Sequence, residues 1–180
     1  MDRKTFLKSS KIGIGLAFVP GISQALVPDS KPSATAEPKI IKDDQGSILN
    51  VIGDIQTHKL VGSDTGNQLV EWVDNVDPGV GIPPHIHTLE DEIFRVIKGE
   101  LEIMVDGKTT VLKEGDIAFA PKNVPHAWKV VGTEKAKMIT TAFPAGIENM
   151  FEELAKLPAG PPDFEKVTKI CGEHGISFLS

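Results

Sequence analysis

The chain has 180 residues, of which 40% are hydrophobic and 24% are charged. This size and balance indicate one soluble domain with terminal tails rather than two domains. The formal net charge is −6, and the first 25 residues carry four basic side chains against one acidic one, so the remainder is more acidic still. Such a charge argues against nucleic acid or an anionic membrane surface as the partner.

Residues 1–25 have the three parts of an export signal. A basic start precedes an apolar run from Ile12 to Val19, and Ser23 and Ala25 supply small residues at a cleavage position. The run is too short to span a bilayer. We therefore expect cleavage after Ala25 and an exported, periplasmic or extracellular protein with no stable membrane anchor. The alternative is an amphipathic N-terminal helix that stays attached.

The stretch DRKTFLK within this segment resembles the twin-arginine export motif, with Lys4 in place of the second arginine. The resemblance implies a bacterial protein that crosses the membrane already folded. The general secretory route remains open as an alternative.

Residues 26–45 are rich in proline, serine and charge, which indicates a linker or an early edge segment. From residue 46 to 143, short β-prone runs alternate with turn signals, a pattern typical of an antiparallel sandwich or barrel. Within this region, Asp106 and Gly107 supply the positive φ angles that a two-residue hairpin turn requires. We therefore predict an all-β domain.

Residues 144–180 switch from strand to helix periodicity. Apolar residues spaced i, i+3, i+4, i+7 predict one amphipathic helix, and they are Ile147, Met150, Phe151 and Leu154. A second short helix over 163–170 and a final strand in GISFL complete a predicted C-terminal helical extension. The first helix either caps the barrel or contributes to a homodimer, and the pattern fits both.

His85 and His87 open the most informative stretch of the sequence. Side chains alternate along a strand, so the two imidazoles project from one face, with Cα atoms about 6.5 Å apart, and can converge on one ion. Glu92 can join them if the chain bends within TLED. The next strand then places Glu92 and Phe94 on one side and Arg95 on the other. A buried carboxylate is costly unless it is paired, and a cation would remove that cost.

A third histidine, His126, begins a later strand and lies on the same side as Trp128. With these spacings the chain resembles the cupin superfamily, whose first motif reads G-x5-H-x-H-x4-E-x6-G. The residues that match are Gly79, His85, His87, Glu92 and Gly99.

The second cupin motif reads G-x5-P-x-G-x2-H-x3-N, and Gly115, Pro121 and His126 match it. Asn123 stands in place of the glycine and Val130 in place of the final asparagine. Because asparagine tolerates a left-handed backbone, we expect the turn at Asn123 to be kept.

The resemblance covers roughly residues 48–143 and implies a jelly-roll barrel, also called a double-stranded β-helix. It further implies that one divalent metal is bound by His85, His87, Glu92 and His126. Three imidazoles and one carboxylate suit iron, manganese, nickel, cobalt or copper, and the sequence does not choose among them. The alternative is a barrel whose histidines only fill the interior.

The predicted pocket beside the metal is apolar. Beyond residue 25 the only arginine is Arg95, which points away, and the chain has no tyrosine. Carboxylate or phosphate groups are usually captured by arginine, so a flat, mostly neutral small-molecule substrate is favoured. The predicted wall consists of Phe94, Phe119, Trp128, Met138 and Thr140 or Thr141, although the aromatic residues would serve equally as barrel core.

Within the superfamily, the chain looks most like the small bacterial cupins grouped with quercetin 2,3-dioxygenase. This resemblance implies an oxidoreductase in which Glu92 takes the substrate proton and the metal orients the substrate and dioxygen. A metal-dependent isomerase or lyase, or a noncatalytic small-ligand binder, remains an alternative, because one fold hosts many functions.

Two further histidines and the single cysteine fit no motif. For His58 and His174 we expect surface or packing roles. Cys171 has no cysteine partner within the chain and is interpreted as a buried or idle thiol.

Overall fold

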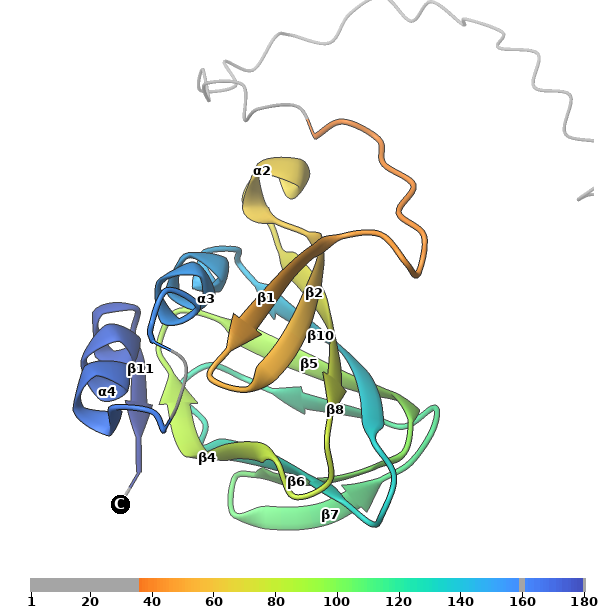
Figure 1. The fold of residues 1–180 in the computed structure, drawn as a ribbon, viewed down its shortest axis with the longest axis vertical. Helices are drawn as coiled ribbons and strands as arrows, with labels where there is room; N and C mark the ends of the chain where they lie inside the picture. Colours follow the sequence, from red (N-terminus) through yellow and green to blue (C-terminus); the bar gives the residue numbers. More distant parts are fainter. Residues whose placement is uncertain (1–35, 159–160, 180) are drawn as a thin grey trace, which may run out of the picture. The chain divides into compact units, whose positions relative to one another are not determined.

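The computed structural model describes residues 36–158 and 161–179. The predicted export signal, 1–25, lies outside these residues. Within them, the chain folds into two antiparallel sheets, to which short helices are added near the C-terminus (Figure 1). The all-β prediction is thus confirmed.

The six-stranded sheet has the order β1-β2-β3-β10-β5-β8. Its strands are β1 (Ser47–Val51), β2 (Asp54–Leu60), β3 (Val70–Val76), β10 (Ala136–Phe143), β5 (Asp91–Lys98) and β8 (Ile117–Ala120). The five-stranded sheet has the order β11-β4-β9-β6-β7. Its strands are β11 (Ile176–Phe178), β4 (Gly81–His87), β9 (His126–Val131), β6 (Glu100–Val105) and β7 (Lys108–Leu112). The helices are α2 (Gly62–Thr65), α3 (Ile147–Leu154) and α4 (Phe164–Glu173).

The turns predicted from the sequence form as expected. In the hairpin of β6 and β7, Val105 lies opposite Lys108, and Asp106 and Gly107 have φ angles of 52° and 72°. Asn123 also adopts a positive φ, 65°, so it replaces the motif glycine without loss of the turn.

Gly99, the last residue of the first motif, turns the chain from β5 into β6. Its φ is +83°, and a Cβ at this position would lie 2.8 Å from the Cα of Ala136. Both the backbone conformation and the close approach therefore require glycine.

The C-terminal extension packs onto the sheets. The four apolar residues of the predicted amphipathic helix are all buried in α3. In α4, the side chain of Asp163 caps the first turn by accepting from the backbone N–H of Lys166. The last strand, β11, pairs with β4, which carries His85 and His87, so the extension closes the edge of the strand that bears two predicted ligands.

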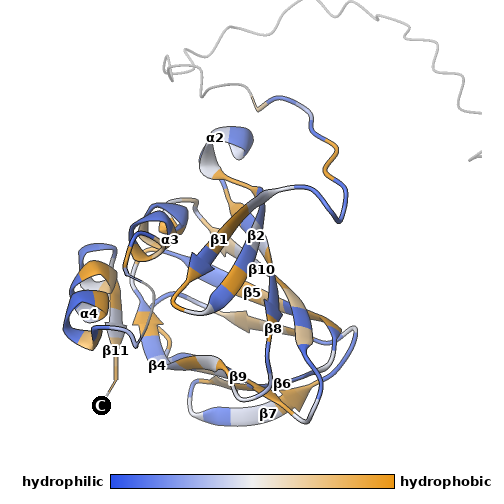
Figure 2. Ribbon diagram, viewed as in Figure 1, coloured by the Kyte–Doolittle hydropathy of each residue, from blue (hydrophilic) through white to orange (hydrophobic). Residues whose placement is uncertain are grey.

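Alternation along the strands separates an inner from an outer surface. Hydrophobic and hydrophilic residues are interspersed along the strands of both sheets (Figure 2). The inward side chains form two apolar clusters, one between the two sheets and one under α3 and α4. No helix in the described ranges has the length and apolar character needed to cross a membrane.

Candidate metal centre and cavity

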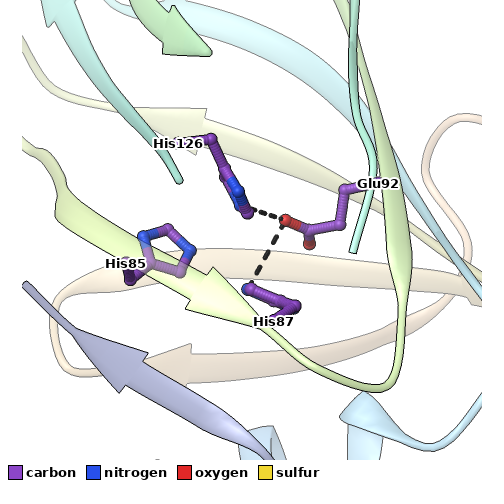
Figure 3. Close-up of side chains that lie close together, drawn as sticks. All are labelled: His85, His87, Glu92 and His126. Atoms are coloured by element: carbon purple, nitrogen blue, oxygen red, sulfur yellow. Dashed lines mark hydrogen bonds and ion pairs between the residues drawn. The ribbon is translucent and has the colours of Figure 1, made fainter. Parts of the chain in front are cut away.

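The four predicted metal ligands come together from three strands (Figure 3). His85 and His87 project from one face of β4, and His126, the first residue of β9, lies directly opposite His85 in the strand register. Glu92 reaches them from β5 in the other sheet. The bend predicted within TLED is what moves the chain from one sheet to the other.

The geometry of this cluster is tight. Each residue is at most 5% exposed, and one ligand atom from each lies within 4.8 Å of the others. The carboxylate oxygen Oε2 of Glu92 lies 3.0 Å from Nε2 of His126 and 3.6 Å from Nε2 of His87. Such convergence of imidazole nitrogens and one carboxylate oxygen suits a divalent transition metal.

Backbone carbonyls orient two of the imidazoles. Nδ1 of His85 donates to the carbonyl of Pro83 at 2.8 Å, and Nδ1 of His126 donates to the carbonyl of Val124 at 3.1 Å. A carbonyl oxygen only accepts, so Nδ1 of each ring carries a hydrogen and Nε2 faces the cluster. Both rings are therefore oriented so that Nε2 can bind a metal when it carries no proton.

Glu90 lies beside the third imidazole, a position that the sequence interpretation missed. Its side chain is buried, and its Oε2 lies 3.6 Å from Nδ1 of His87. Neither atom has a hydrogen-bond partner among the described residues. Moving them about 0.7 Å closer would make a normal hydrogen bond and hold Nε2 of His87 toward Glu92. The acid-rich run Glu90, Asp91, Glu92 was the available signal.

The pKa values show that the cluster is electrostatically coupled. Burial, together with the positive charge of His126 and His87, lowers the pKa of His85 to about 4. Burial would lower the pKa of His87, but the carboxylates of Glu92 and Glu90 outweigh it and raise that pKa. Burial would raise the pKa of Glu92, yet the neighbouring histidines lower it. The site therefore combines an ionised carboxylate with positive charge, and a cation can replace that charge.

The size of the cluster also fits one ion. Metal–nitrogen and metal–oxygen bonds of about 2.1 Å place two opposite ligand atoms about 4.2 Å apart, so the 4.8 Å limit requires only a small contraction. The donor set and its spacing thus fit a bound metal.

The cluster opens into a cavity of about 470 Å³ between the two sheets and the C-terminal helices. Three predicted wall residues, Phe94, Trp128 and Met138, line it, and so does Thr140. Among the residues that the structure describes, no lysine or arginine lines this cavity. The size is within the range of small-molecule sites, and the wall is mostly apolar.

Phe119 is not part of this wall, which corrects the prediction that placed it there. Its side chain is 51% exposed and stacks on Phe143, with ring centroids 6.3 Å apart. Strand β8 directs its alanines inward, with Ala118 opposite Phe94 and Ala120 opposite Glu92. The large side chains on β5 fill the interior there, so only small residues fit opposite them.

Arg95 lies on the exposed side of β5, as predicted. His58 has a packing role: it is 4% exposed and stacks on Trp72, with ring centroids 6.0 Å apart. His174 lies near Glu153 at 3.1 Å, away from the cluster. Cys171 is buried, and burial raises its thiol pKa to about 11, so it is a poor nucleophile.

The fold and the cluster define a double-sheet β barrel with a buried group of side chains that could hold one metal ion. The model of the cupin domain matches residues 72–142. An uncharacterized protein of Aquifex aeolicus is 30% identical over 91 residues, which are 51% of this chain and 68% of that protein. The chain belongs to the cupin superfamily.

Two further comparisons describe its relatives. The quercetin 2,3-dioxygenase of Bacillus subtilis is 26% identical over 121 residues, which are 66% of this chain and 35% of that enzyme. The chain thus spans about a third of the length of this relative. The solved structure of KdgF from a Halomonas species has a TM-score of 0.56 and 19% identity, and the match covers 63% of this chain and 99% of that one. This structural likeness confirms the fold.

Proposed function

We propose that the protein is a metal-dependent dioxygenase that acts on a flat, mostly neutral substrate of the flavonol or phenol type. The observation that carries the proposal is the cluster of three histidines and one glutamate at one end of a mostly apolar cavity, which no lysine or arginine of the described residues lines. The similarity to a quercetin 2,3-dioxygenase supports the same class of substrate.

A divalent iron, manganese, nickel, cobalt or copper ion held by His85, His87, Glu92 and His126 would supply Lewis-acid and redox chemistry. The protein supplies the rest. The carboxylate of Glu92 contacts a hydroxyl group of the bound substrate and accepts the proton of that hydroxyl. Phe94 and Trp128 bind the ring of the substrate, and the apolar wall excludes water from the reaction.

Oxygen uptake tests this proposal directly. Iron-, nickel- and manganese-loaded protein should consume oxygen with quercetin or with a catechol. The variant Glu92→Gln, assayed with enough added metal to keep its site loaded, should lose about 10²- to 10⁴-fold in turnover, because the proton acceptor is removed. Glu102→Gln, on the outer face of β6, is the matched control and should keep full activity.

Two outcomes would contradict the dioxygenase proposal. Conversion of substrate in the absence of oxygen would indicate an isomerase or lyase. Tight binding of the panel without any turnover would indicate a noncatalytic binder.

We also propose that the protein acts outside the cytoplasm. The support is the export-signal pattern of residues 1–25, which lie outside the described residues. N-terminal sequencing of protein secreted by a bacterial host should begin at Leu26. Recovery of intact chains that begin at Met1 in the cytoplasm alone would contradict export.

A further inference from the structure

A second buried polar cluster lies in the wall of the same cavity, on the six-stranded sheet. Asp54 on β2 and Asp74 on β3 are 5% and 1% exposed, and both line the cavity. In the strand register, Glu92 on β5 lies opposite Ala142 on β10, and Ala142 lies opposite Val70 on β3. Val70 is four residues from Asp74 along β3. At ordinary strand spacing the Cα atoms of Glu92 and Asp74 are then about 16 Å apart, so the two polar sites lie at different ends of the cavity.

Neutral donors surround this pair of carboxyl groups. The indole Nε1 of Trp72 and the hydroxyl of Thr140 each donate to Asp74 at 2.8 Å. The amide nitrogen of Gln56 donates to Oδ2 of Asp54 at 2.9 Å, while its oxygen accepts from His58 at 3.0 Å. This chain of bonds fixes which way the Gln56 amide points, so Asp54 is held rigidly.

The charge of the pair is incompletely balanced. Burial and the neighbouring Asp54 raise the pKa of Asp74 well above its usual value, and burial also raises the pKa of Asp54. Any negative charge that the pair carries is therefore buried beside a second carboxyl group. Among the described residues, no lysine, arginine or histidine forms an ion pair with either carboxyl group, and Oδ1 of Asp54 has no hydrogen-bond donor.

A buried charge without a full set of donors is costly, so its retention in an otherwise apolar wall requires a reason. The nearby lining is provided by Val51, Trp72, Met150 and Phe151. A ligand that occupies the cavity would bring the missing donor.

We propose that Asp54 and Asp74 form a second ligand-binding site, which accepts a hydrogen bond from a hydroxyl group at the end of the substrate far from the metal. The inference rests on the proposed function only in that a ligand fills this cavity. It narrows the ligand class to aromatic molecules with hydroxyl groups at both ends, separated by a flat apolar body on the order of 10 Å long.

A matched pair of ligands tests this site. The metal-loaded protein is titrated with 3-hydroxyflavone and with 3,4′-dihydroxyflavone, which differ by one hydroxyl group at the distal ring, and binding is followed by tryptophan fluorescence. A hydrogen bond to a charged acceptor should make the dihydroxy compound bind about 10- to 100-fold more tightly. In Asp54→Asn this preference should fall below about 3-fold, with binding of 3-hydroxyflavone and metal content little changed.

The outer face of the same sheet provides the control. Glu71 on β3 accepts from the hydroxyl of Thr141 at 3.1 Å, which mirrors Asp74 and Thr140 on the inner face. Glu71→Gln should therefore leave the ligand preference intact. Should Asp54→Asn not fold, as judged by circular dichroism, Asp74→Asn provides the same comparison.

The outcomes separate this inference from the proposed activity. Equal affinity of the wild-type protein for the two flavones, binding of neither, or a preference that survives both aspartate substitutions would overturn the second site. A preference that disappears in the variants without any oxygen uptake would support the second site and contradict the dioxygenase.

Discussion

At one end of the cavity Glu92 is buried among three imidazoles, whereas at the other end Asp54 and Asp74 are buried against each other and against neutral donors. Charged partners lower the pKa of Glu92, while their absence lets burial raise the pKa of both aspartates. The same kind of side chain thus has a lowered pKa in the candidate metal site and a raised pKa in the aspartate pair. The difference shows that the partners around a buried carboxylate, rather than burial alone, decide its role.

The largest effect should come from removing a ligand at the metal end. In His126→Ala the site loses an imidazole that also contacts Glu92 at 3.0 Å. We expect metal affinity to fall by more than about 100-fold, measured by calorimetric titration with nickel or manganese. His174→Ala, which removes a histidine away from the cluster, should bind metal like the wild-type protein. Equal affinities for the two variants would contradict the assignment of His126.

A smaller effect is expected from the residue that orients a ligand. Glu90→Gln keeps the size of the side chain but weakens its interaction with Nδ1 of His87. Metal affinity should fall by about 10- to 100-fold in the same titration. Asp91→Asn, in the adjacent residue, retains the acceptor oxygen for the backbone N–H of Lys122 and should have little effect. A loss in Asp91→Asn as large as that in Glu90→Gln would show that the turn, not the carboxylate, matters.

The raised pKa values of Asp54 and Asp74 should make the free energy of unfolding depend on pH. Because the pKa of Asp74 is raised in the folded state, its contribution is fully present below its unfolded pKa near 3.8 and is lost as pH rises through the folded value. Asp54 acts in the same direction. As pH rises above the unfolded value, the free energy of unfolding of the wild-type protein should therefore fall relative to that of Asp74→Asn.

Denaturant unfolding at a series of pH values measures this difference. Asp77→Asn, at an exposed carboxylate just after β3, should follow the wild-type curve. Parallel curves for the wild-type protein and Asp74→Asn would contradict a raised pKa of Asp74 in the folded state.

The smallest effect should come from the aromatic residue that lies outside the cavity. Phe119→Ser should change turnover by less than about 2-fold and the free energy of unfolding by less than about 1 kcal/mol, because the side chain is half exposed. Phe94→Ala, on the facing strand but buried, should cost about 3–5 kcal/mol. A large loss of turnover in Phe119→Ser would return that residue to the substrate site.

Three residues of the candidate metal site could be predicted from local information, whereas His126, 34 residues after Glu92, was predicted from the resemblance to the second cupin motif. His85, His87 and Glu92 lie within eight residues of one another, and strand alternation indicates where each points. Turns and the amphipathic α3 were predictable for the same reason, since Asp106, Gly107 and the i, i+3, i+4, i+7 spacing act over short distances.

The site formed by Asp54 and Asp74 could not be predicted, because polar rather than apolar residues of β2 face the interior. Along β2, Asp54, Gln56 and His58 face inward while Ile55 is 41% exposed. A polar row of this kind normally indicates the solvent face of a strand. Gln56 bridges Asp54 and His58 within this row, and His58 stacks on Trp72 of β3. The local pattern of β2 does not encode the contact with Trp72. The prediction for Phe119 was wrong for a related reason: Phe94 and Glu92 of β5 occupy the interior, so β8 turns Ala118 and Ala120 inward opposite them and Phe119 outward.

The most direct test of the account is the metal content of the folded protein. Elemental analysis after purification from metal-replete medium should give about one divalent transition metal per chain, because the four buried ligands form one site. A content below about 0.2 per chain under the same conditions would contradict the metal centre, and with it the proposed activity.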